Sequence, residues 1–348
     1  MLKLKEKIQS FSFKDVMDCR LEIFGLSAIW IVMFHIYGNI GMISLPGASV
    51  FSKIFSFGNA GVDVFLFLSA IGLYGSMKKN TIANFYKNRI VRMIIPYVVI
   101  AIPYFVWFDF FFKKDGIIQF ILNISTLNFW ITGDHPVWYV AFAAVIYMIF
   151  PVLYKLDVKT KHIFTSLLIP FSIVIEYVLF KTDSIIYANA ERALSRIPIF
   201  LVGMLMANIV LKKKRITCWQ LIVAVAIGIA IFAILVFCPL PLVVTRYLYG
   251  AFAICIVVAY SFIRRMLPLR FLYVIFAWLG TISLEIYMVH VFALRIIKNY
   301  GLWTVIPYKF VWYLLIVGLS VGVAKLLSVA IGKVIKIIKQ KRKVKACE

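Results

Sequence analysis

The most informative stretch of the sequence is Gly61-Val62-Asp63-Val64-Phe65-Leu66-Phe67-Leu68-Ser69-Ala70, an apolar run with a carboxylate near its start and a hydroxyl near its end. Earlier in the chain, another apolar segment of about one helix length ends in a histidine, His35. Ionisable side chains are costly in hydrocarbon and are retained there mainly where they are used. Asp63 and His35 in adjacent apolar segments therefore indicate chemistry within or at the face of a membrane.

The composition of the whole chain is that of a membrane protein. The chain has 348 residues, of which 64% are hydrophobic, and a mean hydropathy of +0.98. So little polar surface excludes a soluble protein of this size, and we expect a single integral-membrane domain over residues 1–348. The net charge of +24 lies in short clusters between apolar runs, which is typical of topology signals and does not indicate nucleic-acid binding. The five cysteines have no metal-ligand spacing, so we expect no metal site.

The apolar runs predict an all-α fold, a polytopic membrane helix bundle of about ten transmembrane helices. The criterion is that a span needs roughly 20 apolar residues. The predicted spans are 21–39, 60–77, 93–112, 137–154, 163–181, 195–211, 218–238, 246–263, 272–293 and 310–331. The apolar stretch 116–132 also contains Asn123, Ser125 and Asn128, so we expect a re-entrant or interfacial helix there.

The basic clusters predict the topology. With ten spans they all fall on one side of the membrane, which is the positive-inside pattern of a multi-pass cell-membrane protein with both termini cytoplasmic. Residues 333–348 form a basic cytoplasmic tail, in which seven Lys and Arg between 333 and 345 alternate with apolar residues. Two interpretations of this tail stay open, a helix lying on the anionic inner leaflet or a disordered basic segment.

This topology brings unusual polar residues together in the extracytoplasmic half of the bundle. They are His35, Asp63, Trp138, Arg196 and His290, whereas Arg89 and Arg92 lie at the cytoplasmic mouth of the third span. Each has a structural alternative. Asp63 can cap its own helix, Arg196 can reach from an interface toward water, and the two cytoplasmic arginines can serve as topology anchors only.

At these residues the chain resembles the acyltransferase-3 family of integral-membrane acyltransferases, which includes bacterial polysaccharide O-acetyltransferases. Six segments match in order and spacing over most of the chain. They are Arg20 to Ala28 with Met33-Phe34-His35, Gly61 to Ser69, Phe85 to Arg89 with Arg92 and Pro96-Tyr97, Trp138-Tyr139 with Tyr147 and Pro151, Arg196 to Gly203, and Ser283 to His290. One position departs from the pattern. The family usually has an arginine eleven residues before the first-helix histidine, where this chain has Phe24, with Arg20 one turn earlier.

The resemblance implies an acyl-CoA-dependent enzyme, most often using acetyl-CoA, that acylates a hydroxyl of a cell-surface or exported glycan or of a lipid-linked saccharide. Acyl transfer to an alcohol needs a base, and a histidine titrates in the right range, so we expect His35 to be the base, with its tautomer set by Asp63 or Glu22. Arg89 and Arg92 are expected to bind the phosphates of CoA. The acceptor is expected near Trp138, Arg196 and His290.

Several alternatives stay open at this point. A transporter or flippase of lipid-linked sugars would also have ten spans and buried polar residues, but it would not turn over acyl-CoA. A catalytically silent family member is favoured by Phe24 in place of the arginine. Within the enzyme hypothesis, the thioester can reach through the bundle, or a covalent acyl-histidine can relay the acyl group.

Overall fold

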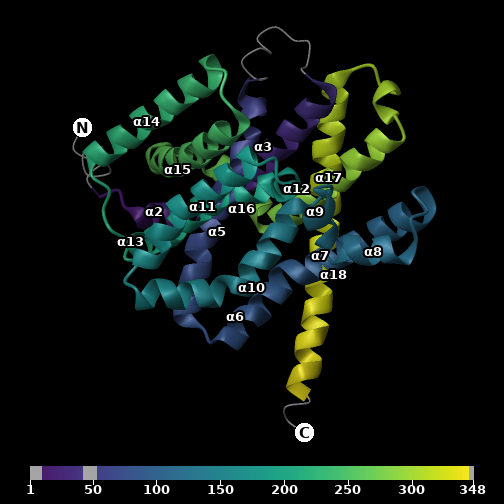
Figure 1. Ribbon diagram of the computed structural model, residues 1–348, viewed down its shortest axis with the longest axis horizontal. Coiled ribbons are helices and arrows are strands. Elements are labelled where there is room, and N and C mark those ends of the chain that lie inside the picture. The colour runs from purple at the N-terminus through teal and green to yellow at the C-terminus, as the bar shows by residue number, and fades with distance from the viewer. Residues whose placement is uncertain (1–9, 42–52, 345–348) are drawn as a thin grey trace. The chain divides into compact units, whose positions relative to one another are not determined.

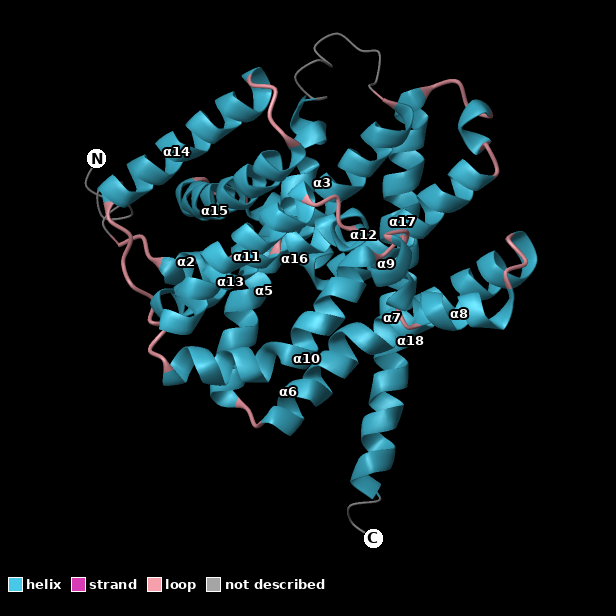
Figure 2. Cartoon of the chain, viewed as in Figure 1, coloured by secondary structure: helices cyan, strands magenta, loops and turns pink. Residues whose placement is uncertain are grey.

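The computed structural model describes residues 10–41 and 53–344. The lysines among the first nine residues and the last four residues, with Cys347, lie outside the described residues. Every regular element in the described part is a helix, as Figure 2 shows, apart from an isolated antiparallel bridge between Ser12 and Arg215. The prediction of an all-helical fold is confirmed.

The predicted number of spans is also confirmed. Nine of the described helices are long and apolar enough to cross a membrane, or ten if a broken pair counts as one span. The nine are Arg20–Ile40, Lys53–Lys79, Ile82–Phe112, Trp138–Lys159, Ile163–Lys181, Ile185–Leu211, Cys218–Phe237, Leu242–Met266 and Lys309–Ile337, and the pair is Arg270–Thr281 with Ser283–Asn299. The chain is therefore a multi-pass membrane protein. The ninth predicted span, 272–293, is thus broken at Ile282 instead of continuous.

Two further predictions concern segments at the margin of the membrane. The stretch 116–132 forms two short helices, α8 (Gly116–Ile124) and α9 (Leu127–Thr132), each far shorter than a span. The last helix, α18 (Lys309–Val344), has 36 residues and is therefore about 54 Å long, well beyond the roughly 30 Å of the hydrocarbon core. Its basic end continues the last span as one helix (yellow in Figure 1) and is not a separate surface helix.

The chain divides into two compact units, each assembled from two stretches of sequence, Met1–Asn80 with Met148–Thr281 and Thr81–Tyr147 with Ile282–Glu348. The first unit holds α2 (Phe13–Asp18), α3 (Arg20–Ile40), η1 (Phe57–Asn59), α5 (Ala60–Lys79), α11 (Ile163–Lys181), α12 (Ile185–Leu194), α13 (Ile197–Leu211), α14 (Cys218–Phe237), α15 (Leu242–Met266) and α16 (Arg270–Thr281). The second holds α6 (Ile82–Arg89), η2 (Ile90–Ile94), α7 (Ile95–Phe105), η3 (Val106–Phe112), α8, α9, α17 (Ser283–Asn299), η4 (Leu302–Thr304) and α18. Helix α10 (Trp138–Lys159) contributes to both.

Close backbone contact defines the centre of the first unit. A Cβ atom at Gly203 in α13 would lie 2.6 Å from the backbone oxygen of Phe67 in α5, so only glycine permits this approach. Small residues commonly allow such contacts between membrane helices. Helices α5 and α13 run in the same direction here, because Asp63 lies near Arg196 and Phe67 lies near Gly203 further along both helices. The close packing therefore places the two charged residues together.

Aromatic packing and π-helices mark the second unit. Helices α7, α17 and α18 contact one another, and the Tyr104 and Phe292 rings stack with centroids 4.1 Å apart. The two segments η2 and η3 are π-helices that flank α7 within one continuous span. Such segments add a residue to a helical turn and often occur at functional sites, where they redirect side chains. Arg92 lies in the first of them and Asp109 in the second.

Candidate functional site

A buried pair of opposite charges is the centre of the candidate site. Asp63 in α5 and Arg196 at the start of α13 are each 1% exposed, and the Arg196 Nε lies 3.7 Å from the Asp63 Oδ1. Neither carboxylate oxygen of Asp63 has a hydrogen-bond partner among the described residues. The N-cap of α5 is Asn59, so the alternative that Asp63 caps its own helix is wrong. A buried pair held this loosely contributes little to stability, which favours a functional role.

Local sequence explains how Arg196 is held. Pro198 near the start of α13 favours a helix beginning there, and Arg196 is its N-cap residue. The guanidinium donates hydrogen bonds to the backbone oxygen of Arg192 at 2.9 Å, to Ser195 Oγ at 3.3 Å and to Asn59 Oδ1 at 2.8 Å. The Arg192 carbonyl lies at the C-terminal end of α12, where carbonyls lack helical partners and favour a cation. The break between α12 and α13 thus positions the arginine.

More charged residues surround this pair. Arg246 in α15 pairs with Glu191 in α12 at 2.8 Å, and Glu176 in α11 accepts a hydrogen bond from the Tyr247 hydroxyl at 2.5 Å. Glu176 lies inside the predicted span 163–181, and Tyr247 is its partner in the structure. Arg246 also acts electrostatically on Asp63. We call the set of Asn59, Asp63, Glu176, Glu191, Arg192, Arg196, Arg246 and Tyr247 the polar cluster.

His35 lies half-buried near the end of α3, a helix that packs against α5 and η1. Its ring lies 5.2 Å from that of Phe34, and the charge of Arg192 acts on it electrostatically. The expectation that Glu22 sets the tautomer of His35 is wrong. Glu22 accepts hydrogen bonds from Tyr260 and Arg264, and it lies about 20 Å from His35 along the same helix. Asp63 pairs instead with Arg196.

The position that departs from the family pattern is filled by an aromatic contact. Phe24 stacks on Phe65 of α5 with ring centroids 4.9 Å apart. The Arg20 guanidinium lies over the Phe24 ring at 5.0 Å, and a Cβ atom at Gly72 would be 2.9 Å from both of its terminal nitrogens. The arginine therefore bends forward to the level of Phe24 and reaches α5.

The two arginines expected to bind CoA lie in the second unit, at α6 and η2. Arg89 is the last residue of α6, is half-buried, and lies over the Phe85 and Tyr147 rings at 5.5 and 5.7 Å. Arg92 follows in the π-helix and is exposed. The charges of the two arginines act on each other, so they form one local patch of positive charge.

The other two predicted residues, Trp138 and His290, also belong to the second unit. Trp138 is the first residue of α10 and is 8% exposed. The next residue, Tyr139, contacts α17, where its backbone N–H donates a hydrogen bond to the Tyr287 hydroxyl at 3.3 Å. His290 is fully buried, and its Nδ1 lies 3.0 Å from the Ile286 carbonyl. Nδ1 must donate to that carbonyl, so Nε2 is the acceptor nitrogen of the neutral ring.

Sequence reasoning missed a second buried polar group, which lies in the second unit. The Asn123 side chain donates to Asp109 Oδ1 at 2.9 Å, and its backbone oxygen accepts from His135 Nε2 at 2.9 Å. His135 is 2% exposed, and this burial lowers its pKa to about 4. The π-helix that carries Asp109 could not be seen in the sequence, although the asparagine within an apolar stretch was a usable signal.

A third group was also missed, in the first unit. Asp157 of α10 is fully buried and accepts hydrogen bonds from Tyr74, Thr165 and His162. His162 Nε2 in turn lies 2.7 Å from Asn208 Nδ2. These residues join α5, α10, α11 and α13 through satisfied hydrogen bonds, so this group is structural.

A known protein family matches most of this chain. The family model of the acyltransferase-3 family, described as an acyltransferase domain, matches residues 25–329. No curated protein and no solved structure matches the chain. Because the match covers most of the chain, the protein belongs to the acyltransferase-3 family.

Proposed function

We propose that this member of the acyltransferase-3 family transfers an acyl group, in the first instance acetyl, from acyl-CoA to a hydroxyl of a cell-surface or exported glycan. The observation that carries the proposal is the loosely held, fully buried pair of Asp63 and Arg196 inside the polar cluster. Ionisable groups in membrane spans mark functional sites more often than structural ones. Family membership supplies the reaction class, and the acetyl group and the glycan are our extension of it.

In the proposed mechanism His35 is the general base. It removes the proton of the acceptor hydroxyl as that oxygen attacks the thioester carbonyl, and the resulting tetrahedral intermediate expels CoA as a thiolate, which takes up the proton from His35. Arg196 binds the acceptor, and Asp63 holds the guanidinium of Arg196 in place within the polar cluster. The proposal that Trp138 and His290 bind the acceptor rests on the family resemblance alone.

The donor is proposed to bind at Arg89 and Arg92. CoA carries several phosphates, and an arginine offers a planar, two-pronged donor that suits a phosphate. The Arg89 guanidinium packs over two aromatic rings, whereas exposed Arg92 can approach an anion directly. Both termini and the 78–92 region are proposed to be cytoplasmic, which is where CoA is available.

The position of Phe24 bears on whether the protein is active. A silent member of the family would need no cation in this part of the first helix. The Arg20 guanidinium lies over Phe24 and against Gly72, so a cation is present at this level of α3. This supports an active enzyme.

Turnover of acyl-CoA by the purified protein tests the proposal. The full chain in nanodiscs is incubated with radiolabelled acetyl-CoA and a glycan extract, and both CoA release and label in the glycan are measured. We expect both for the native chain and neither for His35→Ala. The matched control is His162→Gln, which alters a histidine of the structural group around Asp157 and should retain turnover per folded protein. Absence of CoA release with acetyl-CoA and longer acyl-CoA donors would refute an acyl-CoA-dependent activity.

A further inference from the structure

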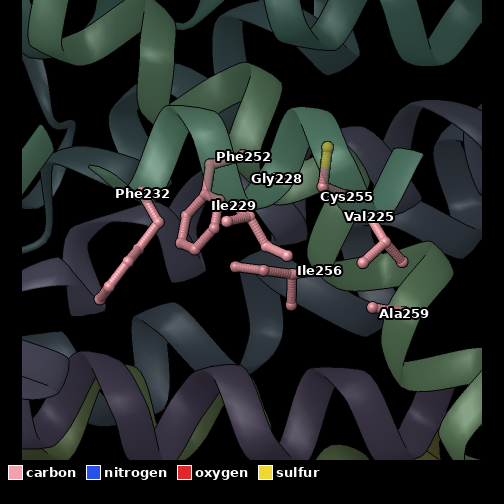
Figure 3. Close-up of a pocket in the computed structure, with 8 residues that line it drawn as sticks. All are labelled: Val225, Gly228, Ile229, Phe232, Phe252, Cys255, Ile256 and Ala259. Atoms are coloured by element: carbon pink, nitrogen blue, oxygen red, sulfur yellow. The ribbon is translucent and has the colours of Figure 1, made fainter. Parts of the chain in front are cut away.

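An apolar groove lies between α14 and α15 of the first unit. It has a volume of about 310 Å³ and is lined by eight residues, four from α14 between Val225 and Phe232 and four from α15 between Phe252 and Ala259 (Figure 3). Apart from the Cys255 thiol, every side chain in its wall is hydrocarbon. The occupant of such a groove must be hydrocarbon too, because a polar group would lose its hydration without gaining a partner.

The groove is open at the surface of the protein and lies in the middle of two candidate spans. Ile229 in its wall is 65% exposed, and the lining segments 225–232 and 252–259 lie well inside helices Cys218–Phe237 and Leu242–Met266. Gly228 helps to shape it, since a Cβ atom there would be 3.0 Å from the Cβ of Cys255. A chain from the bilayer can therefore enter the groove from the side.

One end of the groove lies close to the polar cluster. Phe232 and Phe252 have ring centroids 6.2 Å apart, and the Phe57 ring lies 5.3 Å from Phe232. Phe57 is two residues before Asn59, which accepts a hydrogen bond from Arg196. The Phe57 ring thus contacts the groove, and the backbone leads from Phe57 to Asn59 of the polar cluster two residues later.

Helix α15 also connects the groove with the polar cluster. Arg246 belongs to the polar cluster, Tyr249 packs against Phe57 with centroids 6.2 Å apart, and the groove follows from Phe252 onward. At 1.5 Å per residue, the groove begins about 9 Å from Arg246 along the helix and extends to about 20 Å. A molecule that fills it and reaches the polar cluster must therefore carry a polar head on a hydrocarbon tail.

We infer that the groove binds the tail of a lipid-linked saccharide, whose sugar head is the acceptor held at the polar cluster. The inference rests on the proposed function for the identity of the head, and on the groove and its aromatic connection for the tail. The head would meet Asn59, Arg196 and Glu191, which offer donors and acceptors to sugar hydroxyls. If the acceptor were a free, water-soluble glycan, lipid from the bilayer would fill the groove instead.

Photocrosslinking tests the tail site without requiring acyl transfer. The full chain is placed in phosphatidylcholine nanodiscs with a polyisoprenyl phosphate that carries a diazirine in its tail, and crosslinked peptides are quantified by mass spectrometry. A phosphatidylglycerol with the same diazirine in an acyl chain is the comparison probe. We expect the polyisoprenyl probe to label peptides 225–232 and 252–259 and to be displaced there by excess unlabelled polyisoprenyl phosphate.

Variants that fill the groove should reduce this labelling. Ala259→Phe should lower crosslinking about tenfold, since a ring placed in the groove excludes the tail. Ala251→Phe is the matched control, because Ala251 is exposed on the same helix outside the groove wall. Should Ala259→Phe fold poorly, Ile229→Trp at the open side of the groove makes the same test.

The outcomes separate this inference from the proposed function. Equal labelling by the phosphatidylglycerol probe, or labelling that excess polyisoprenyl phosphate does not displace, would mean that bulk lipid fills the groove, and the inference would be overturned. Acylation of a water-soluble glycan with no groove labelling would overturn it while leaving the proposed function standing. Displaceable groove labelling without CoA release would support the tail site and count against the enzyme.

Discussion

Removing the two partners of the buried ion pair singly should have unequal effects on stability. In Arg196→Met, Asp63 stays 1% exposed and loses the nearest cation, and no hydrogen bond from a described residue replaces it. Breaking a buried pair in this way typically costs about 3–5 kcal/mol in the free energy of unfolding. In Asp63→Asn, Arg196 retains its hydrogen bonds to Arg192, Ser195 and Asn59. The cost should then be only about 1 kcal/mol.

The double variant and a control complete this experiment. Asp63→Asn combined with Arg196→Met removes both charges, so it should cost about 2–3 kcal/mol less than the sum of the single changes. Arg246→Met breaks the pair with Glu191, whose two side chains are 14% and 12% exposed. Because this pair is less buried, the variant should lower the free energy of unfolding by less than Arg196→Met does. The free energy of unfolding is measured in mixed micelles by titration with dodecyl sulfate, followed by circular dichroism. Equal costs for the two single variants, or costs that add in the double variant, would refute this account of the pair.

Three further predictions concern the base, the donor site and the effect of pH. His35→Ala should lower acyl transfer about 10²–10⁴-fold in protein that elutes as the folded species, and near-normal turnover would move the base to His290. Arg89→Ala and Arg92→Ala should each raise the KM for acyl-CoA roughly ten- to a hundredfold, and Arg→Lys should recover only part of the loss; an unchanged KM in both alanine variants removes them from the donor site. Burial lowers the pKa of His135 from 6.5 to about 4, so the unfolded chain takes up a proton between these values that the folded chain does not. Stability should therefore be retained above pH 6.5 and fall by up to about 1.4 kcal/mol per unit as the pH drops toward 4, whereas His135→Gln should flatten this slope in pH-dependent melting curves.

Sequence patterns predicted the spans well because span length depends on local composition. The fifth predicted span, 163–181, agrees with α11 at both ends, and the sixth, 195–211, ends where α13 ends. The breaks were not predictable in this way. Ile282 is as apolar as its neighbours, so composition does not show that α16 and α17 separate there. The π-helix over 106–112 likewise depends on how the span packs and not on its residue types.

The candidate site was predictable by residue type but not by pairing. A carboxylate or a guanidinium inside an apolar run is visible in the sequence, so Asp63 and Arg196 could both be selected. Their proximity depends on a glycine contact between α5 and α13, and the hydrogen bond from Arg196 to Asn59 joins residues 137 positions apart. Asn59 was missed because an asparagine before a helix is expected as a cap. The partner of Glu176, Tyr247, lies 71 positions away in another helix and was equally hidden.

The two parts of the proposed acceptor site differ in how tightly their helices are held, and this difference fits their roles. In the apolar 18-residue segment of Lys53–Lys79, the span that carries Asp63, 67% of the residues are buried, whereas the corresponding segments of Cys218–Phe237 and Leu242–Met266 have only 17% and 22%. Groups that perform or orient chemistry must be fixed within a fraction of an ångström, which a helix packed on several sides provides. A hydrocarbon tail needs no such geometry, but it must enter and leave sideways through the bilayer. Helices α14 and α15, which are loosely covered beside the groove, permit that exchange, and Phe57 links the groove to Asn59 of the polar cluster.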